Sequence, residues 1–219
     1  MAYFPFLIDI KRKLCVIAGG GAVAYRKAEI MLGFGAKVKV VAPDISDSMK
    51  LLVENGKEIM IQQRNFQIND LRNADFVIAA TDDERVNSYI SQKCRERDIL
   101  VNVVDVKEEC SFIFPAVIKK DDLLISISSG GNSPAAAAFL KDKIEDRIPD
   151  YYGKVVTMLG RYRRDIKETV LDAQDRKELY YELLEYAAEH NGELAECCIK
   201  AMIGKYAANR RSEDVIWKE

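Results

Sequence analysis

The chain has 219 residues, with 33 Lys and Arg against 35 Asp and Glu, so its formal net charge is −2 at pH 7. Apolar residues make up 48% of the chain and charged residues 31%, a balance typical of a globular protein with a sizeable core. This balance argues against a nucleic-acid-binding surface, and no apolar run approaches the roughly 20 residues that span a bilayer. We therefore expect no nucleic-acid partner and no membrane partner.

The cysteine and histidine content narrows the chemistry further. The five cysteines form an odd set without a CxxC pair, which argues against a disulfide framework and a zinc knuckle. The N-terminal KRK follows the first apolar stretch, the opposite order to a secretory signal, so we predict a cytoplasmic protein. His190 is the single histidine, so we predict no metal site. The chemistry must then use carboxylates, hydroxyls, backbone amides or a cofactor.

Short β-branched runs alternate with helical patterns up to about residue 130. Four of these runs are nearly continuous in Val, Ile, Leu and Ala, which indicates strands covered on both faces, as in a parallel sheet. The pattern predicts an α/β fold with a Rossmann-like parallel sheet. The predicted strands cover residues 14–18, 37–42, 59–62, 76–80, 100–104 and 123–128, and the predicted helices cover 23–34 and 85–97.

The pattern changes after the turn-rich loop SSGGNSP at residues 128–134. Pro134 is suited to the first turn of a helix, and Pro149 ends it. Further helices are predicted over 155–170, 175–190 and 193–208, followed by a polar tail over 209–219. We predict a Rossmann-like domain over 1–113, a small α+β middle segment over 114–149 and a helical domain over 150–219.

A glycine-rich turn joins the first strand to the first helix. Residues 19–24 read GGGAVA, a GxGxxA pattern between a strand and a helix, with a second strand about 20 residues on. Gly19 permits the tight turn, Gly21 lets backbone amides approach a pyrophosphate, and Ala24 lets the helix pack closely on the strand. A tight turn without a ligand is the alternative, but the full context favours a dinucleotide site.

Polar residues follow the second and fourth predicted strands. Asp44 lies one or two places later than the usual ribose-binding acid and has no arginine beside it, which favours NAD over NADP. Thr81 follows the fourth strand, which ends in the small residues Ala79 and Ala80. Small residues followed by polar ones suit the edge of a cofactor site at the carboxyl ends of the strands. Alternatively, Asp82 or Asp83 caps the next helix, which is compatible with that role.

Two further segments contain candidate groups for a substrate. Asp105 ends the fifth strand and is suited to act as a general base or to hold a cation; capping of its loop is the alternative. Phe112 and Phe114 either line a pocket for a flat ligand or belong to the core, which is favoured. Hydroxyls and amides of the loop 128–134 suit carboxylate or phosphate groups, the alternative being a helix cap with turn glycines.

Together these segments resemble the precorrin-2 dehydrogenase and sirohydrochlorin ferrochelatase family, which includes the N-terminal module of siroheme synthase. The resemblance covers about residues 3–150. The matching strings are FPFLIDIKRKLCVIAGGGAVAYRKAEIMLGFGAKVKVVAP, FVIAATDDERVN, VNVVDVKEECSFIFPAVI and ISISSGGNSPAAAAFLKDKIE.

The resemblance implies NAD-dependent oxidation of precorrin-2, a tetrapyrrole, to sirohydrochlorin. It assigns Asp105 a catalytic role and places Ser129 at the tetrapyrrole site. We therefore predict that Ser128, Ser129 and Gly130 bind the substrate. It also implies NAD contacts at Ala22, Val23, Pro43 and Asp44, besides the glycines of the turn. It further implies a homodimer built through the middle segment, and leaves open insertion of Fe²⁺ as a second activity. The alternative is an NAD- or tetrapyrrole-binding module without turnover.

The substrate's carboxylates suit basic side chains, and Lys107 and Lys119 are candidates. His190 precedes an Asn-Gly pair, so we expect it at the solvated end of a helix rather than at a metal.

Overall fold

A computed structural model describes the backbone of residues 3–216 and the side chains of residues 3–208. The chain forms two compact units. The first contains the described residues up to Phe114 together with Gly130–Asn132, and the second contains Pro115–Ser129 and the described residues from Ser133 onward. The second unit thus holds most of the predicted middle segment together with the helical region, and the division of these two at residue 150 stays a prediction.

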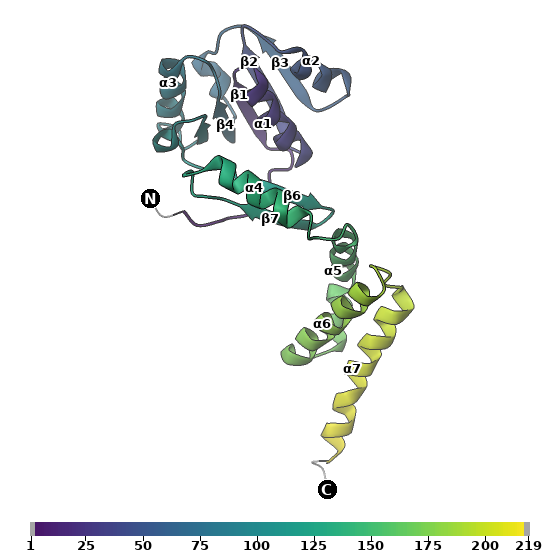
Figure 1. Ribbon diagram of the computed structural model, residues 1–219. Helices are drawn as coiled ribbons and strands as arrows, with labels where there is room; N and C mark the ends of the chain where they lie inside the picture. The colour runs from purple at the N-terminus through teal and green to yellow at the C-terminus, as the bar shows by residue number, and fades with distance from the viewer. Residues whose placement is uncertain (1–2, 217–219) are drawn as a thin grey trace. The chain divides into compact units, whose positions relative to one another are not determined.

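The first unit is built on a five-stranded parallel sheet in the order β3-β2-β1-β4-β5, which confirms the predicted Rossmann-like fold (Figure 1). The strand order reverses between β1 and β4, and in such folds ligands bind at the carboxyl edge beside this reversal. The strands are β1 (Leu14–Ala18), β2 (Lys37–Ala42), β3 (Ile59–Gln63), β4 (Phe76–Ala79) and β5 (Leu100–Val103).

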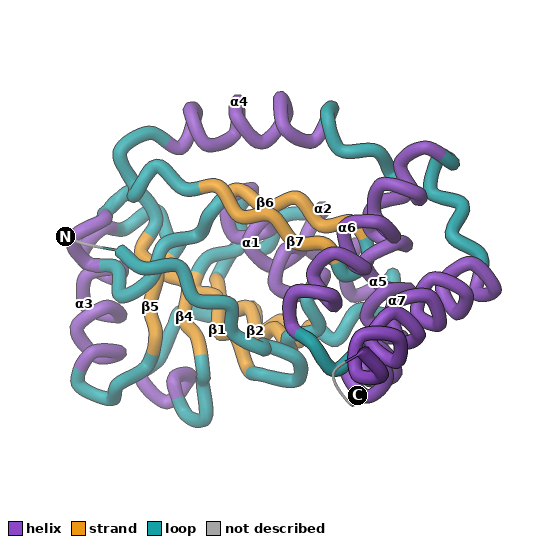
Figure 2. Tube along the Cα trace, turned by 90° about the horizontal axis from the view of Figure 1, so that it is seen from below, coloured by secondary structure: helices purple, strands orange, loops and turns teal. Residues whose placement is uncertain are grey.

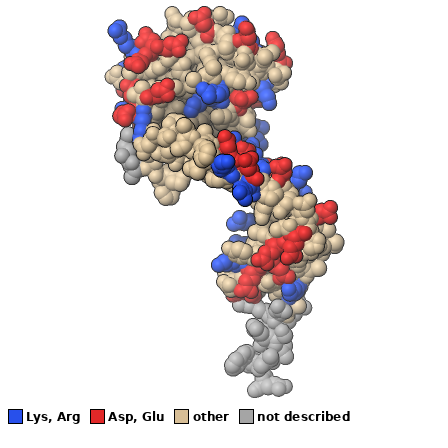
Figure 3. All heavy atoms as spheres, in the orientation of Figure 1, with Lys and Arg blue, Asp and Glu red and all other residues tan. Residues whose placement is uncertain are grey.

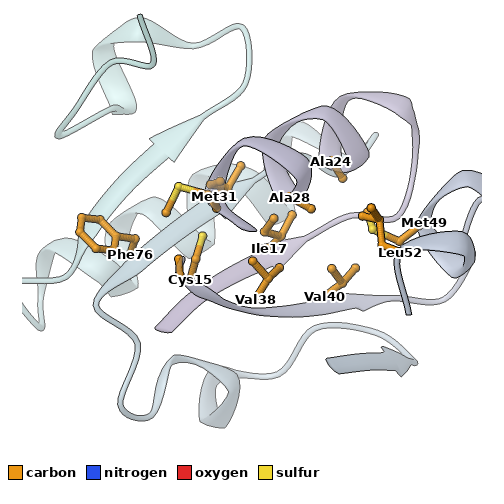
Figure 4. Packing of buried hydrophobic residues seen from close by; sticks show 12 residues of the cluster. Cys15, Ile17, Ala24, Ala28, Met31, Val38, Val40, Met49, Leu52 and Phe76 are labelled. Carbon is orange, nitrogen blue, oxygen red and sulfur yellow. The ribbon is translucent and has the colours of Figure 1, made fainter. Parts of the chain in front are cut away.

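Helices cover both faces of this sheet. Helices α1 (Ala22–Gly33) and α2 (Asp47–Glu54) pack on one face, where alternate side chains of β1 and β2 meet them (Figure 4). Helix α3 (Glu84–Arg95) and the 3₁₀ turn η1 (Ile68–Leu71) pack on the other face. This two-sided cover explains the continuous apolar runs of the strands. Helix α2 was not predicted, because only Met49 and Leu52 of its eight residues are buried.

A buried carboxylate links the 3₁₀ turn η1 to strand β2 and to the segment that follows β3. Asp70 of η1 is 2% exposed and accepts hydrogen bonds from Lys39 Nζ of β2 and Arg64 Nη2, both at 2.6 Å. The backbone amide of Gln67 donates a third, at 2.9 Å. Burial alone would raise the pKa of Asp70, but these three donors outweigh it and hold the pKa well below its usual range. The cluster is a structural ion-pair network.

The second unit begins with an antiparallel hairpin of β6 (Ala116–Lys120) and β7 (Leu123–Ile127), on which α4 (Pro134–Glu145) packs (Figure 2). The predicted strand at 123–128 is β7, which lies outside the parallel sheet and pairs with β6. The sequence did not predict β6 as a strand, because it continues the apolar run that contains Phe112, Phe114 and Pro115.

Three helices complete the second unit: α5 (Tyr151–Thr169), α6 (Ala173–Glu189) and α7 (Glu196–Ile216). They share a core that includes Val155, Leu183 and Ile199. The predicted polar tail over 209–219 is corrected, since α7 continues to Ile216, and residues 217–219 lie outside the described residues. None of the helices in residues 3–216 combines the length and apolar character that a membrane span requires.

Candidate functional site

The first two glycines of the turn after β1 are needed for close packing. Gly19 has φ +123°, and a Cβ built on it would lie 2.1 Å from the carbonyl oxygen of Ala80 at the end of β4. A Cβ on Gly20 would lie 2.1 Å from the carbonyl oxygen of Asp44. The turn is therefore held between the loops that follow β2 and β4, and side chains at these two positions would push those loops away.

Gly21 differs, because a Cβ built on it would meet nothing within 4 Å. It is the N-cap residue of α1, and no described side chain caps this helix. The first turn, which begins with Ala22 and Val23, contains no acidic residue. Uncapped amides at the positive end of a helix, facing open space, form a site for an anion. These residues therefore fit the pyrophosphate of a dinucleotide.

The loop after β2 lies against this turn. The backbone amide of Ser46 donates to the carbonyl oxygen of Gly20 at 3.0 Å, which holds the loop in place. Pro43 and Asp44 are exposed there. Asp44 therefore lies beside the glycine turn, two residues after the end of β2.

The loop after β4 is fixed by a residue that sequence analysis missed. Asn87 of α3 is 6% exposed, and its side-chain oxygen accepts from the Thr81 amide at 3.1 Å and from Thr81 Oγ1 at 2.8 Å. Its amide nitrogen donates back to the Thr81 carbonyl at 2.9 Å. The available signal was a polar residue on the buried face of the predicted helix. Asp83 caps α3 by accepting from the Arg85 amide, so the capping interpretation is confirmed for Asp83.

Asp105 follows β5 and is exposed in a left-handed backbone conformation with φ +63°. This conformation is uncommon outside glycine and is most readily accepted by Asp and Asn. The N-cap residue of the following 3₁₀ turn η2 (Lys107–Glu109) is Val106, so Asp105 does not occupy the capping position of that turn. The Cys110 thiol anchors the far end of the loop, 3.2 Å from the Val103 amide.

Lys27 is a second residue that no motif indicated. Its ammonium lies 3.8 Å from the centre of the Phe114 ring, in a half-buried position on α1. Burial lowers the pKa of Lys27 to about 8, while the nearby Cys110 and Asp105 act in the opposite direction. Phe114 and Phe112 pack against the α1-side core, so the core interpretation of this apolar run is confirmed.

The glycine-rich loop before α4 is largely occupied with its own structure. The Ser133 hydroxyl caps α4 at the Ala136 amide, and the Ser129 hydroxyl accepts from the Ser133 amide at 2.9 Å. Gly130 and Gly131 have φ of +62° and +80°, so the alternative of a helix cap with turn glycines is confirmed.

The predicted substrate residues are divided between the units. Ser128 and Ser129 belong to the second unit, while Gly130 belongs to the first. Within the first unit, Lys107 Nζ donates to Asn132 Oδ1 at 3.2 Å, so the segment 130–132 lies against the loop that carries Asp105.

His190 lies at the end of α6, as expected, with its ring stacked on Tyr186 at 3.9 Å. Within residues 3–216, no three or more His, Cys, Asp and Glu side chains gather as a metal site would require.

A parallel sheet with reversed strand order, an uncapped helix behind a glycine turn and polar strand ends together define a dinucleotide-binding Rossmann-like protein. A family model described as "Putative NAD(P)-binding" matches residues 6–116, and the chain belongs to this NAD(P)-binding family. A second model, described as "Sirohaem biosynthesis protein central", matches residues 120–147.

Relatives and a solved structure agree with this assignment. Siroheme synthase of Pseudomonas paraeruginosa is 37% identical over 196 residues, which are 90% of this chain and 41% of the relative. Siroheme synthase of Buchnera aphidicola is 38% identical over 183 residues, which are 84% of this chain and 38% of the relative. The chain thus spans about two fifths of the length of these relatives. The structure of SirC, precorrin-2 dehydrogenase, has the same fold, with a TM-score of 0.75, 23% identity, and coverage of 93% of this chain and 98% of that one.

Proposed function

We propose that this protein oxidises precorrin-2 to sirohydrochlorin with NAD as the hydride acceptor. The observation that carries the proposal is the open, uncapped start of α1 at Gly21, in the same unit as an exposed aspartate at a neighbouring strand end. The siroheme synthase relatives support the substrate. The proposed location is the cytoplasm, where the five free cysteines would stay reduced.

The cofactor would be held mainly by the backbone. The amides of Ala22 and Val23 would bind the pyrophosphate, with Gly19 and Gly21 providing the turn and the open space. Pro43 and Asp44 would contact the adenosine ribose, and the Asp44 carboxylate would accept from its 2′-hydroxyl, which favours NAD over NADP. The Asn87 side chain would hold Thr81 at the lip of this site.

The chain itself needs to bind the substrate and accept one proton. A bound nicotinamide ring supplies the acceptor for the hydride. Asp105 would take the proton that leaves the substrate with the hydride, since its carboxylate is exposed at the carboxyl edge of the sheet. Ser128, Ser129 and Gly130 would bind substrate carboxylates, and the Lys27 ammonium adds a positive charge near Asp105.

The proposal is tested by mixing the protein anaerobically with precorrin-2 and either NAD or NADP. We expect sirohydrochlorin and NADH to form together, with NAD preferred. Reduced cofactor absent from both mixtures would contradict the proposal, and binding of NAD and precorrin-2 without turnover would support a binding module instead. Preference for NADP would overturn only the role of Asp44.

Iron insertion is the second candidate, because the relatives are named for siroheme and the exposed Asp105 carboxylate offers an oxygen ligand for Fe²⁺, here a substrate. The assay adds Fe²⁺ to sirohydrochlorin with and without the protein. Iron insertion at equal rates in both would rule this activity out.

We also propose a homodimer. Phe139 and Leu140 of α4 are 62% and 48% exposed, which gives the middle segment an apolar surface suited to a second copy. Light scattering of the purified chain should give twice the monomer mass, and a monomer at micromolar concentration would contradict this proposal.

A further inference from the structure

An open cavity of about 400 Å³ lies between helices α5 and α6 of the second unit. Its lining is predominantly basic: Arg163 and Lys167 come from α5, and Arg176 and Tyr180 come from α6. In each helix the two residues are four apart and therefore lie on one face. In Figure 3, basic side chains gather along one margin of this helical region.

The three basic side chains differ in what holds them. Arg176 donates from Nη1 to the carbonyl oxygens of Val170 and Leu171 at 2.8 and 2.6 Å, so it is anchored at the end of α5. Among the described residues, neither Arg163 nor Lys167 has a carboxylate within ion-pair distance. Three positive charges around one cavity repel each other, and an anion bound between them would offset this repulsion.

The helix dipole explains only part of this arrangement. Lys167 lies in the last turn of α5, where a positive charge interacts favourably with the helix end. Arg163 lies one turn earlier, where this effect has faded. The neighbouring Arg164 is close to Asp165, at 3.9 Å, and does not line the cavity.

The shape and chemistry of the lining indicate the class of anion. Arginine forks bind carboxylates and phosphates in a bidentate manner. The cavity is within the range of about 300–1,000 Å³ found for organic ligands and much larger than one phosphate needs. The half-buried Tyr180 adds an aromatic surface that an inorganic ion does not use.

We propose that this α5–α6 pocket binds an organic anion with two or more carboxylates. Precorrin-2 belongs to this class, so the pocket would bind carboxylate side chains of the proposed substrate. That identification rests on the proposed function, whereas binding of a polycarboxylate does not.

The test titrates the full chain with uroporphyrin III, a stable tetrapyrrole with eight carboxylates, and separately with inorganic pyrophosphate. Three proteins are compared: the wild type, the double variant R163Q/K167Q and the matched control R164Q. We expect R163Q/K167Q to bind uroporphyrin at least tenfold more weakly, and R164Q to bind it within twofold of the wild type. Thermal unfolding of all three checks that the fold is retained.

Equal uroporphyrin affinity in R163Q/K167Q and the wild type would contradict binding at the α5–α6 pocket. If the wild type bound pyrophosphate more tightly than uroporphyrin, and R163Q/K167Q lost that binding, the ligand of the pocket would be an inorganic anion and the proposal of an organic ligand would fail. NADH formation by the wild type is measured separately, so failure of the pocket and failure of the proposed function can be told apart.

Discussion

The two units of the chain place their charges differently. In the first unit, the basic side chains Lys39 and Arg64 share the buried Asp70, and the candidate cofactor site is built from backbone amides and open space. In the second unit, Arg163 and Lys167 line a cavity, and no carboxylate of the described residues lies within ion-pair distance of either side chain. The comparison teaches that a basic cluster with its own buried acid stabilises the fold, whereas one without an acid is a candidate for binding.

The largest expected effect concerns Asp105, the proposed proton acceptor in the first unit. D105N should lower kcat by about 100-fold or more, because general acid–base groups contribute about 10²–10⁴ to rates. Its NAD affinity should stay unchanged, since the cofactor is held by the glycine turn. Steady-state NADH formation measures the rate. The matched control is D82N at the exposed end of β4's loop, and a D105N rate equal to that of D82N would reject the role of Asp105.

The buried ion pair of the first unit should have the next largest effect. D70N should reduce the free energy of unfolding by about 3 kcal/mol at pH 7, because Lys39 and Arg64 lose their shared carboxylate. The pKa of Asp70 is lowered in the folded state, so its contribution is present above about pH 4 and is lost as the pH falls further.

Urea unfolding across this pH range should therefore show the gap between wild type and D70N narrowing below about pH 4. The matched control is D47N, which removes an exposed ion pair with Lys50 and should cost at most about 1 kcal/mol. Equal losses for the two variants would contradict the structural role of Asp70.

Alanine substitutions of two glycines, one at each end of α1, test whether the backbone forms the cofactor site. A Cβ meets nothing within 4 Å at either Gly21 or Gly33, so both alanine variants should fold. G21A should weaken NAD binding by about tenfold, since its methyl group enters the space proposed for the pyrophosphate. G33A should bind NAD like the wild type. Calorimetric titration measures both, and equal affinities would place the cofactor elsewhere.

The smallest effect is expected in the second unit. Without a ligand, R163Q/K167Q should change the free energy of unfolding by no more than about 0.5 kcal/mol, because both side chains are exposed and neither has a carboxylate partner among the described residues. Urea unfolding provides the measurement. A loss of the size expected for D70N would show that these basic residues stabilise the fold, which would remove the contrast between the two units.

Features that depend only on a short stretch of sequence, such as the buried strands and the glycine turn, could be predicted. Strands β1 and β2 were predicted to the residue, because burial on both faces leaves a continuous apolar run. The glycine turn was recognisable because each position of GxGxxA has its own steric reason. β6 was missed because a strand in a small hairpin is hard to distinguish from other apolar segments.

The missed site residues depend on contacts between distant segments. Lys27 faces Phe114 across 87 positions of the sequence, and the α5–α6 pocket needs side chains from two helices. Neither arrangement has a local pattern. Asn87 was within reach, since a polar residue on the buried face of a helix requires a partner.

The most direct test of the central claim is a single turnover under anaerobic conditions, with the protein loaded with NAD and then mixed with one equivalent of precorrin-2. We predict equimolar NADH and sirohydrochlorin appearing with the same rate constant, because hydride and proton leave the substrate at one site. Sirohydrochlorin that forms without NADH, or precorrin-2 that stays unchanged while NAD is bound, would contradict the account.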